Sequence, residues 1–190
     1  MTENLSLIPA GTASFSEDGV YRYELTRSLG RGRGGGADRT VAVCMLNPST
    51  ADASVNDPTV RRVTMWSGKA GYTMLVVLNA FAYRATDPKA MMAAEDPIGP
   101  ENDSYLGLWF SRADTLIFAW GVHCAHLQRN LAVLEIAKGL EVQPYCFATT
   151  AGGAPGHPLY LAGPFRTKPW PEYYDYPTIR PQTQAVVDYG

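Results

Sequence analysis

The sequence lacks several features, and each absence excludes a class of protein. No apolar run approaches the roughly 20 residues that a membrane-spanning helix needs. The first residues also lack the basic-then-apolar pattern of a secretory signal, so we expect a cytoplasmic protein without membrane contact. Cysteine is scarce. Cys44, Cys124 and Cys146 are an odd number without a C-x-x-C pair, which predicts buried thiols and excludes a disulfide framework or a four-cysteine metal site.

A surplus of positive charge is also missing. The formal net charge is -2, whereas strong nonspecific binding of nucleic acid needs a basic face that displaces counterions. Any contact with nucleic acid must therefore be local. One local cluster exists, and its simpler interpretation is a solvated edge hairpin rather than a nucleic-acid contact. The cluster comprises Arg22, Arg27, Arg31, Arg33 and Arg39, followed later in the chain by Arg61 and Arg62.

The length and composition indicate a single globular domain. The chain has 190 residues, of which 46% are hydrophobic and 18% charged, so it can form one full core but is short for two. We expect residues 1–190 to form this one domain, with a core at about 19–163. A proline- and tyrosine-rich tail follows at 164–190.

The N-terminal part of the sequence predicts a strand followed by a flexible loop. Residues 19–26 are rich in strand-forming side chains, and we expect them to pair with the next strand. The glycine-rich segment 30–36 contains a formal G-x-G-x-x-G match. It precedes a strand instead of joining a strand to a helix, so it is better explained as a hairpin loop than as a dinucleotide site.

The rest of the chain alternates between strand and helix patterns. Short apolar runs predict buried strands, and Pro58 after a possible Asp57 N-cap predicts the start of a helix. Asp87-Pro88 and Asp96-Pro97 can each begin a short helix. We therefore expect an α/β fold, a three-layer sandwich with a mainly parallel four-stranded central sheet and an N-terminal strand or hairpin. The expected strands are 40–46, 73–78, 115–120 and 143–147, and the expected longer helices are 58–71, 102–111 and 124–140.

Polar residues follow the ends of these strands. Asn47, Asn79 and Trp120-Gly121 come after the first three strands, and His157 lies in the loop after the fourth. In parallel sheets, ligands collect beyond the carboxyl ends of the strands. The sequence therefore predicts a site at this edge, centred on the loops of Asn47 and His157.

Four motifs at these positions resemble those of a bacterial and phage family known only as a domain of unknown function, family 1643. They are residues 45–52 (MLNPSTAD), 57–62 (DPTVRR), 79–88 (NAFAYRATDP) and 157–161 (HPLYL). The likeness runs from about residue 20 to residue 161. It implies no established reaction.

The order of the strand-end motifs is also similar, more distantly, to that of the uracil-DNA glycosylase superfamily. The corresponding motifs are Asn47-Pro48, residues 77–80 (VLNA), Trp120-Gly121 and residues 157–159 (HPL). The resemblance implies a uracil-DNA-glycosylase-like fold. It also implies an activity on the N-glycosidic bond, or on the base, of a nucleic acid or nucleotide, with a modified pyrimidine as one option.

The resemblance assigns chemical roles to two residues. His157 corresponds to the donor that stabilises the negative charge on the leaving base. Asn47 stands where the superfamily has an Asp or Asn that holds the attacking water, but an amide is a poor general base. Of Asp52, Asp57 and Asp87 near the same edge, Asp52 is the expected auxiliary base, because Asp57 is more simply a helix cap.

The remaining expected site residues would recognise the base or the phosphate of a ligand. Asn79 matches the amide that reads a pyrimidine edge, and Phe81 or Tyr83 could stack on a flipped base. Arginine forks suit phosphate, which makes three arginines candidates for that contact. The other expected base-site residues are Pro48, Ser49 and Trp120, and the phosphate candidates are Arg61, Arg62 and Arg84.

Purely structural explanations compete with these roles. Residues 47–50 are a good turn sequence, and Asn79 could cap a neighbouring loop, whereas His157 in a glycine-rich loop is harder to explain as core filling. His123 and His126 are spaced like metal ligands but lack a carboxylate or thiolate companion, so we expect no metal and no redox cofactor. Ser49 lacks the G-x-S-x-G context, which argues against a Ser–His mechanism.

Three hypotheses follow. The leading one is a glycosylase-like hydrolase that acts on a nucleic acid or nucleotide. The second is a module that binds a modified base or nucleotide without cutting it, as the amide at Asn47 and the modest charge would allow. The third is a partner-binding protein, in phage defence or counter-defence, that docks through the tail at 169–189.

Overall fold

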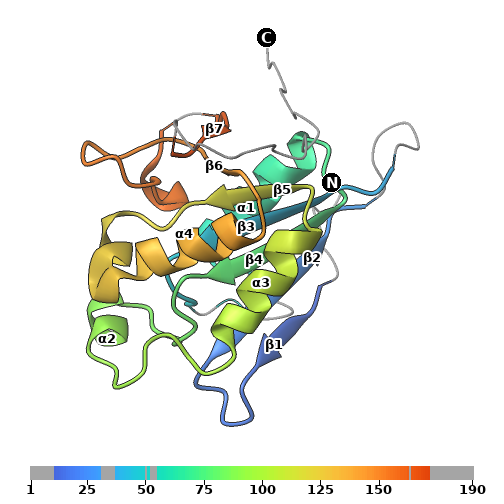
Figure 1. The fold of residues 1–190 in the computed structure, drawn as a ribbon. Coiled ribbons are helices and arrows are strands. Elements are labelled where there is room, and N and C mark those ends of the chain that lie inside the picture. The colour runs from blue at the N-terminus through green and yellow to red at the C-terminus, as the bar shows by residue number, and fades with distance from the viewer. Residues whose placement is uncertain (1–10, 31–36, 50, 52–54, 163, 172–190) are drawn as a thin grey trace.

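The computed structural model describes residues 11–30, 37–49, 51, 55–162 and 164–171, and these build one mixed β-sheet (Figure 1). Its strands are β1 (Ala13–Phe15), β2 (Arg22–Ser28), β3 (Thr40–Met45), β4 (Met74–Asn79), β5 (Thr115–Phe118), β6 (Pro144–Cys146) and β7 (Lys168–Pro169). The order across the sheet is β1-β2-β4-β3-β5-β6-β7. Strands β4, β3, β5 and β6 are parallel, and the outer strands pair antiparallel. The prediction of an α/β fold with a four-stranded parallel core is confirmed.

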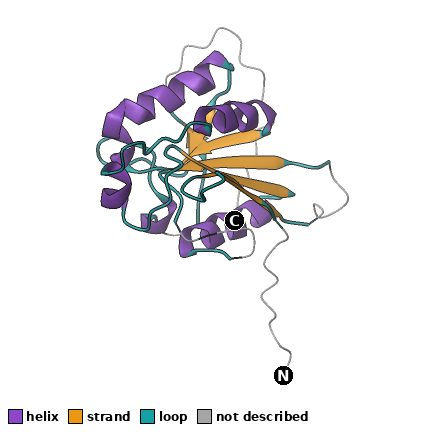
Figure 2. Ribbon diagram, turned by 90° about the horizontal axis from the view of Figure 1, so that it is seen from below, coloured by secondary structure: helices purple, strands orange, loops and turns teal. Residues whose placement is uncertain are grey.

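Helices cover both faces of this sheet (Figures 1 and 2). The α-helices are α1 (Pro58–Lys69), α2 (Pro88–Met92), α3 (Asn102–Arg112) and α4 (Arg129–Gly139), and the 3₁₀ helices are η1 (Val122–Gln128) and η2 (Pro158–Tyr160). Helix α1 packs on one face, whereas α3 and α4 pack on the other. Within the residues described, no helix has the length and apolar character to cross a bilayer.

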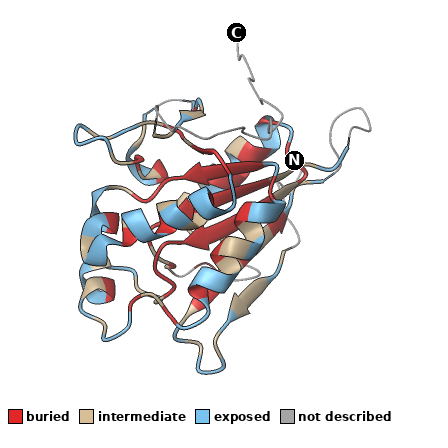
Figure 3. Ribbon diagram, viewed as in Figure 1, coloured by how far each residue is buried: buried red, intermediate tan, exposed pale blue. Residues whose placement is uncertain are grey.

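The central strands are buried because both of their faces are covered (Figure 3). Successive side chains of a strand point to opposite faces. Val41 of β3 accordingly belongs to the same hydrophobic cluster as Val60 of α1. Its neighbour Ala42 belongs to the other cluster, with Phe110 of α3. This explains why the strand sequences are continuously apolar rather than alternating.

The cysteine prediction is confirmed. Cys44, Cys124 and Cys146 are buried and none of them is in a disulfide. Burial raises the pKa of the Cys44 and Cys124 thiols, so both stay protonated near neutral pH. Their role is therefore to pack the core.

The three Asp-Pro pairs do not all begin a helix. Asp57 caps α1, because its Oδ1 accepts a hydrogen bond from the backbone N–H of Val60 at 2.8 Å, and Asp87 caps α2 in the same way through Lys89. Asp96 instead accepts from two successive backbone N–H groups, at Ile98 and Gly99, which closes a turn. The expected short helix at Asp96-Pro97 was therefore wrong.

The predicted pairing of the N-terminal strand was also wrong. Strand β2 pairs with β4 and β1, not with β3, so it lies inside the sheet. Arg22 and Arg27 are 1% and 0% exposed, which overturns the solvated-hairpin interpretation for these two residues. Arg22 donates to the carbonyl oxygen of Ala51, and Arg27 donates to the side chain of Asn56. Arg31, Arg33 and the glycine-rich loop at 31–36 lie outside the described residues.

The helix expected at 124–140 begins later. Helix α4 starts at Arg129, after a 3₁₀ segment in which Leu127 and Gln128 have positive φ angles of 51° and 54°. Leu127 and Leu131 are exposed, whereas Arg129 is buried. Arg129 donates from Nε to the carbonyl oxygen of Ala80 at 2.7 Å and pairs with a carboxylate of α3. The buried face of α4 therefore consists of Arg129, Val133 and Ala137 and not of the expected leucines.

The tail hypothesis falls mostly outside the described residues. Residues 172–190 are not described, and of the proposed docking strip only 169–171 are. Partner binding through this tail stays a prediction.

Gly99 provides a first test of the fold. Its φ of +86° strains any other residue, and an added Cβ would meet Cδ1 of the Tyr21 ring at 2.8 Å. We expect Gly99→Ala to lower the free energy of unfolding by roughly 1–3 kcal/mol, measured by urea denaturation. Gly107→Ala in α3 is the control, because its Cβ meets open space, and it should stabilise by roughly 0.5–1 kcal/mol. Equal effects of the two changes would contradict this account.

Candidate functional site

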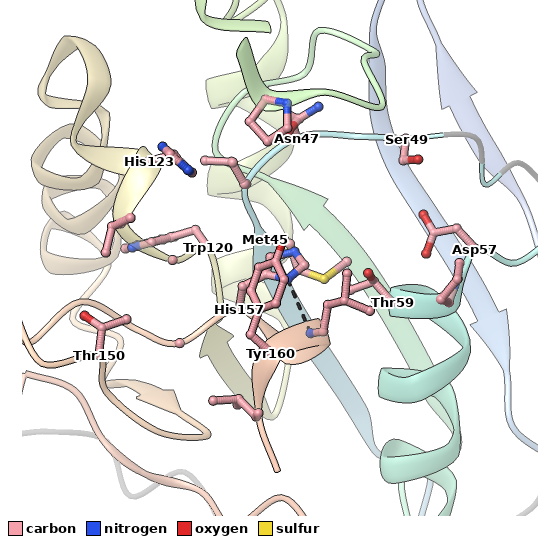
Figure 4. A pocket seen from close by; sticks show the side chains of 18 of the residues that line it. Met45, Asn47, Ser49, Asp57, Thr59, Trp120, His123, Thr150, His157 and Tyr160 are labelled. Atoms are coloured by element: carbon pink, nitrogen blue, oxygen red, sulfur yellow. Dashed lines mark hydrogen bonds between the residues drawn. The ribbon is translucent and has the colours of Figure 1, made fainter. Parts of the chain in front are cut away.

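A cavity of about 540 Å³ lies at the carboxyl ends of the parallel strands (Figure 4). This volume is typical of small-molecule sites, which span roughly 300–1,000 Å³. Its wall comes from the loop after β3, the start of α1, the residues after β5 and the loop after β6. The polar or aromatic side chains that these segments contribute include Asn47, Ser49, Asp57, Thr59, Trp120, His123, Thr150 and His157.

Asn47 is held through both hydrogens of its side-chain amide. Nδ2 donates to the carbonyl oxygen of Pro48 at 3.1 Å and to that of Ala85 at 2.7 Å. These bonds tie the loop after β3 to the segment after β4. The polar atom left for a ligand is Oδ1, an acceptor. Asn47 can therefore hold a water molecule but cannot take its proton.

His157 is positioned by its own backbone turn. It stands at the N-cap of η2, where its Nδ1 accepts a hydrogen bond from the backbone N–H of Leu159 at 3.3 Å. Burial lowers the pKa of His157, and the nearby Asp57 partly opposes that shift. A neutral imidazole whose Nδ1 is an acceptor carries its proton on Nε2. His157 therefore offers a neutral N–H donor at the cavity wall.

The loop of His157 is attached to two other parts of the site. The backbone N–H of Gly121 donates to the carbonyl oxygen of Pro155 at 2.8 Å, and Gly121 has a φ of 76°, which suits glycine. Arg62 of α1 donates to the carbonyl oxygens of Pro158 and Leu161. Arg62, expected to contact phosphate, thus holds the His157 loop in place.

The other two phosphate candidates lie away from the cavity wall. Arg61 is exposed on α1. Arg84 donates to the carbonyl oxygen of Gly19 at 2.8 Å and stacks over the ring of Phe15. Arg84 also lines a smaller hollow of about 370 Å³, which shares Ser49 with the main cavity.

Asn79 does not line the cavity. Its side chain is almost fully buried, and its Oδ1 accepts a hydrogen bond from Nη2 of Arg22 at 3.1 Å. Arg22 itself lines the cavity. Nδ2 of Asn79 has no hydrogen-bond partner among the described residues. Arg22 thus lies between this amide and any ligand.

The remaining expected base-site residues divide into three groups. Trp120 lines the cavity, as does Ser49. Phe81 is fully buried in the core, and Pro48 is buried beside Asn47. Tyr83 lines the smaller neighbouring hollow. The structure thus brings Asn47, Ser49, Trp120 and His157 to one cavity and leaves the other predicted residues that it describes off the cavity wall. Asp52 lies outside the described residues.

Sequence reasoning missed several cavity residues. Arg22 was grouped with the arginine cluster interpreted as a solvated hairpin, because an arginine in an alternating strand usually faces solvent. Asp57 was one of three carboxylates expected near this edge, but it was interpreted as a helix cap; the cap itself places its side chain at the cavity. Thr59 and Thr150 had no distinguishing pattern, and His123 was considered only as a metal ligand. Among the described residues, no three His, Cys, Asp or Glu side chains gather closely enough to hold a metal ion.

The buried imidazole predicts a pH dependence of stability. The pKa of His157 in the folded protein lies below the ordinary value of about 6.5. The contribution of the neutral imidazole to the free energy of unfolding is thus fully present above pH ~6.5. It is lost as the pH falls through the folded-state pKa. We expect the free energy of unfolding to fall from pH 7 to pH 5 more steeply in the wild type than in His157→Asn. Parallel pH profiles from urea denaturation would rule out this contribution.

Comparison with known proteins bears on the same segments. No curated protein and no solved structure matches the chain. Residues 22–159 match the family described as "Protein of unknown function (DUF1643)". The match begins at Arg22, includes both Asn47 and His157, and covers the cavity wall except for Tyr160 and Leu161. Because it covers more than two thirds of the sequence, the chain belongs to the DUF1643 family.

Proposed function

We propose that the protein hydrolyses the N-glycosidic bond of a nucleic acid or nucleotide, with a three-layer fold similar to that of the uracil-DNA glycosylase superfamily. The observation that carries the proposal is that Asn47 and His157, from the first and last strand-end motifs, line one cavity. The two residues are more than 100 positions apart in the sequence. Their meeting at a site large enough for a nucleoside supports a shared chemical task.

His157 supplies the stabilisation that this reaction needs most. When the bond between the sugar carbon and the base nitrogen breaks, its electron pair leaves with the base, which becomes an anion. A neutral N–H donor against the base oxygen stabilises charge that develops only in the transition state. The Leu159 N–H bond to Nδ1 keeps Nε2 protonated for this purpose.

Asn47 orients the nucleophile in this scheme. Its Oδ1 accepts a hydrogen bond from water and turns a water lone pair toward the sugar carbon. Because both Nδ2 hydrogens are already bonded to Pro48 and Ala85, the amide is held in one orientation. Orientation of this kind lowers the entropic part of the barrier.

Recognition of the base falls to the cavity wall. Ser49, Thr59 and Thr150 are the neutral polar side chains there, and Trp120 adds an aromatic wall. Asn79 would read a pyrimidine edge only if Arg22 moved aside. For phosphate, Arg84 in the adjoining hollow and the exposed Arg61 are the available candidates, since Arg62 is bonded to the His157 loop.

Base release tests the proposal directly. The protein is incubated with single- and double-stranded oligonucleotides that contain uracil, hypoxanthine or a bulky modified pyrimidine, and with the free nucleosides. Abasic sites are revealed by alkaline cleavage of the oligonucleotides, and free bases by chromatography. Release from at least one substrate is expected. No release from any of them would overturn the hydrolase.

A second function, binding without cleavage, is favoured by one observation. Asn47 presents an amide where hydrolysis would be faster with a carboxylate, and its two donor bonds also serve the loop structurally. Titration with the same nucleosides, followed by the intrinsic tryptophan fluorescence to which Trp120 at the cavity wall contributes, separates the two functions. Saturable quenching without base release would favour the binding module.

A further inference from the structure

The reaction proposed above lacks a proton acceptor. Water that attacks the sugar carbon must lose a proton, and neither the amide of Asn47 nor a neutral His157 that donates from Nε2 is suited to take it. A carboxylate at the same cavity would complete the chemistry. Among the described residues that line the cavity, Asp57 is the carboxylate.

The capping role of Asp57 uses only part of its side chain. Oδ1 accepts the hydrogen bond from the Val60 N–H at 2.8 Å, which fixes the carboxylate at the first turn of α1. Oδ2 makes no hydrogen bond within the described part of the chain. The side chain is half-buried and lines the same cavity as His157 (Figure 4). A helix N-cap thus delivers one free carboxylate oxygen to the site.

Asp57 and His157 also interact electrostatically. The negative charge of Asp57 raises the pKa of the His157 imidazole, against the larger effect of burial. The other titratable residues that line the cavity are Arg22, His123 and Tyr160. The backbone N–H of Tyr160 donates to the carbonyl oxygen of His157 at 3.1 Å, and the centroids of their rings lie 5.6 Å apart. The Asp57 carboxylate therefore acts electrostatically on the His157 imidazole, and both side chains line the same cavity.

We propose that Asp57 is the general base of this site and acts opposite His157; the inference rests on the proposed hydrolysis. Oδ2 of Asp57 takes a proton from water as the water oxygen bonds to the sugar carbon. The bond from that carbon to the base nitrogen breaks, and its electron pair leaves with the base, which Nε2–H of His157 stabilises. The base anion then takes up a proton from solvent, and Asp57 returns its own proton to solvent.

Replacing Asp57 with asparagine distinguishes its proposed role as a general base from its role as a helix cap. Asn caps helices about as well as Asp, so Asp57→Asn should keep α1 folded while removing the proton acceptor. We expect the single-turnover rate of base release to fall by about 10²–10⁴-fold. The fall in rate at low pH that comes from protonation of the base should also disappear. Thermal unfolding should stay close to that of the wild type.

Asp87→Asn is a matched control. Asp87 also precedes a proline and caps a helix through its side chain, but it does not line the cavity. Its replacement should leave the rate and the pH profile unchanged. Wild-type-like turnover by Asp57→Asn would overturn the inference, as would a rate loss that merely follows unfolding of α1.

A second measurement does not need turnover. Titration of the His157 imidazole by NMR should show a lower pKa in Asp57→Asn than in the wild type, and no change in Asp87→Asn. An unchanged His157 pKa would overturn the pairing of Asp57 with His157. If the wild type released no base from any substrate, the proposed function would fall and with it the role of Asp57 as a base. Turnover that survives in Asp57→Asn would overturn the role of Asp57 alone.

Discussion

Replacing His157 with asparagine should lower the rate of base release by about 10²–10³-fold while leaving the protein folded. The imidazole does two separable things. Its Nδ1 accepts the Leu159 N–H and so caps η2, and in the proposed reaction its Nε2–H would donate to the leaving base. The shorter asparagine side chain can still accept the Leu159 N–H but has no atom at the Nε2 position. The rate is measured under single-turnover conditions on the substrate that the wild type cleaves best.

Glutamine at the same position serves as the comparison. Its amide nitrogen lies near the place of the imidazole Nε2, so His157→Gln should keep part of the stabilisation and fall between the wild type and His157→Asn. A His157→Asn rate within about threefold of the wild type would remove His157 from the chemistry. A large loss of thermal stability in His157→Asn would instead assign the residue to the structure of its loop.

Much of the sheet could be predicted from local pattern alone. The segments that form β3, β4 and β5 are continuously apolar because each strand lies between two helical layers. Burial on both faces can therefore be recognised from a stretch of only a few residues. Asp57 and Pro58 marked the start of α1 for a similar reason, since a cap and its helix are neighbours in sequence. The position of the carboxyl edge of the sheet could be predicted from the order of these strands and this helix.

The side chains whose positions could not be predicted are held by hydrogen-bond partners that are distant in the sequence. Arg22 is buried because a carbonyl oxygen 29 residues away and the Asn79 side chain accept its hydrogen bonds. Nothing near Arg22 in the sequence signals either contact. The same contact removes Asn79 from the cavity wall, although its position at the end of β4 was predicted. Sequence pattern therefore located the edge of the sheet where the cavity lies, but not which side chains reach that cavity.

Trp120 links the stability of the core to the shape of the cavity, and its removal should have the largest effect on folding. The side chain is 1% exposed, and its ring stacks on Phe118 with centroids 4.2 Å apart. Trp170 meets it edge to face at 5.9 Å. Trp120→Ala should lower the free energy of unfolding by about 3–5 kcal/mol, because the packed core cannot collapse around so large a void. Urea denaturation measures this loss.

Two further variants show whether the loss comes from packing at the cavity. Trp120→Phe keeps an aromatic ring against Phe118 and should lose less than half as much. Trp109→Ala removes a half-buried tryptophan on α3, which is remote from the cavity, and should also cost less. Because Trp120 forms part of the cavity wall, Trp120→Phe should weaken nucleoside binding while Trp109→Ala leaves it unchanged. A loss below about 1 kcal/mol in Trp120→Ala would mean that this ring is not packed as described, since truncation of a fully buried tryptophan costs several times more.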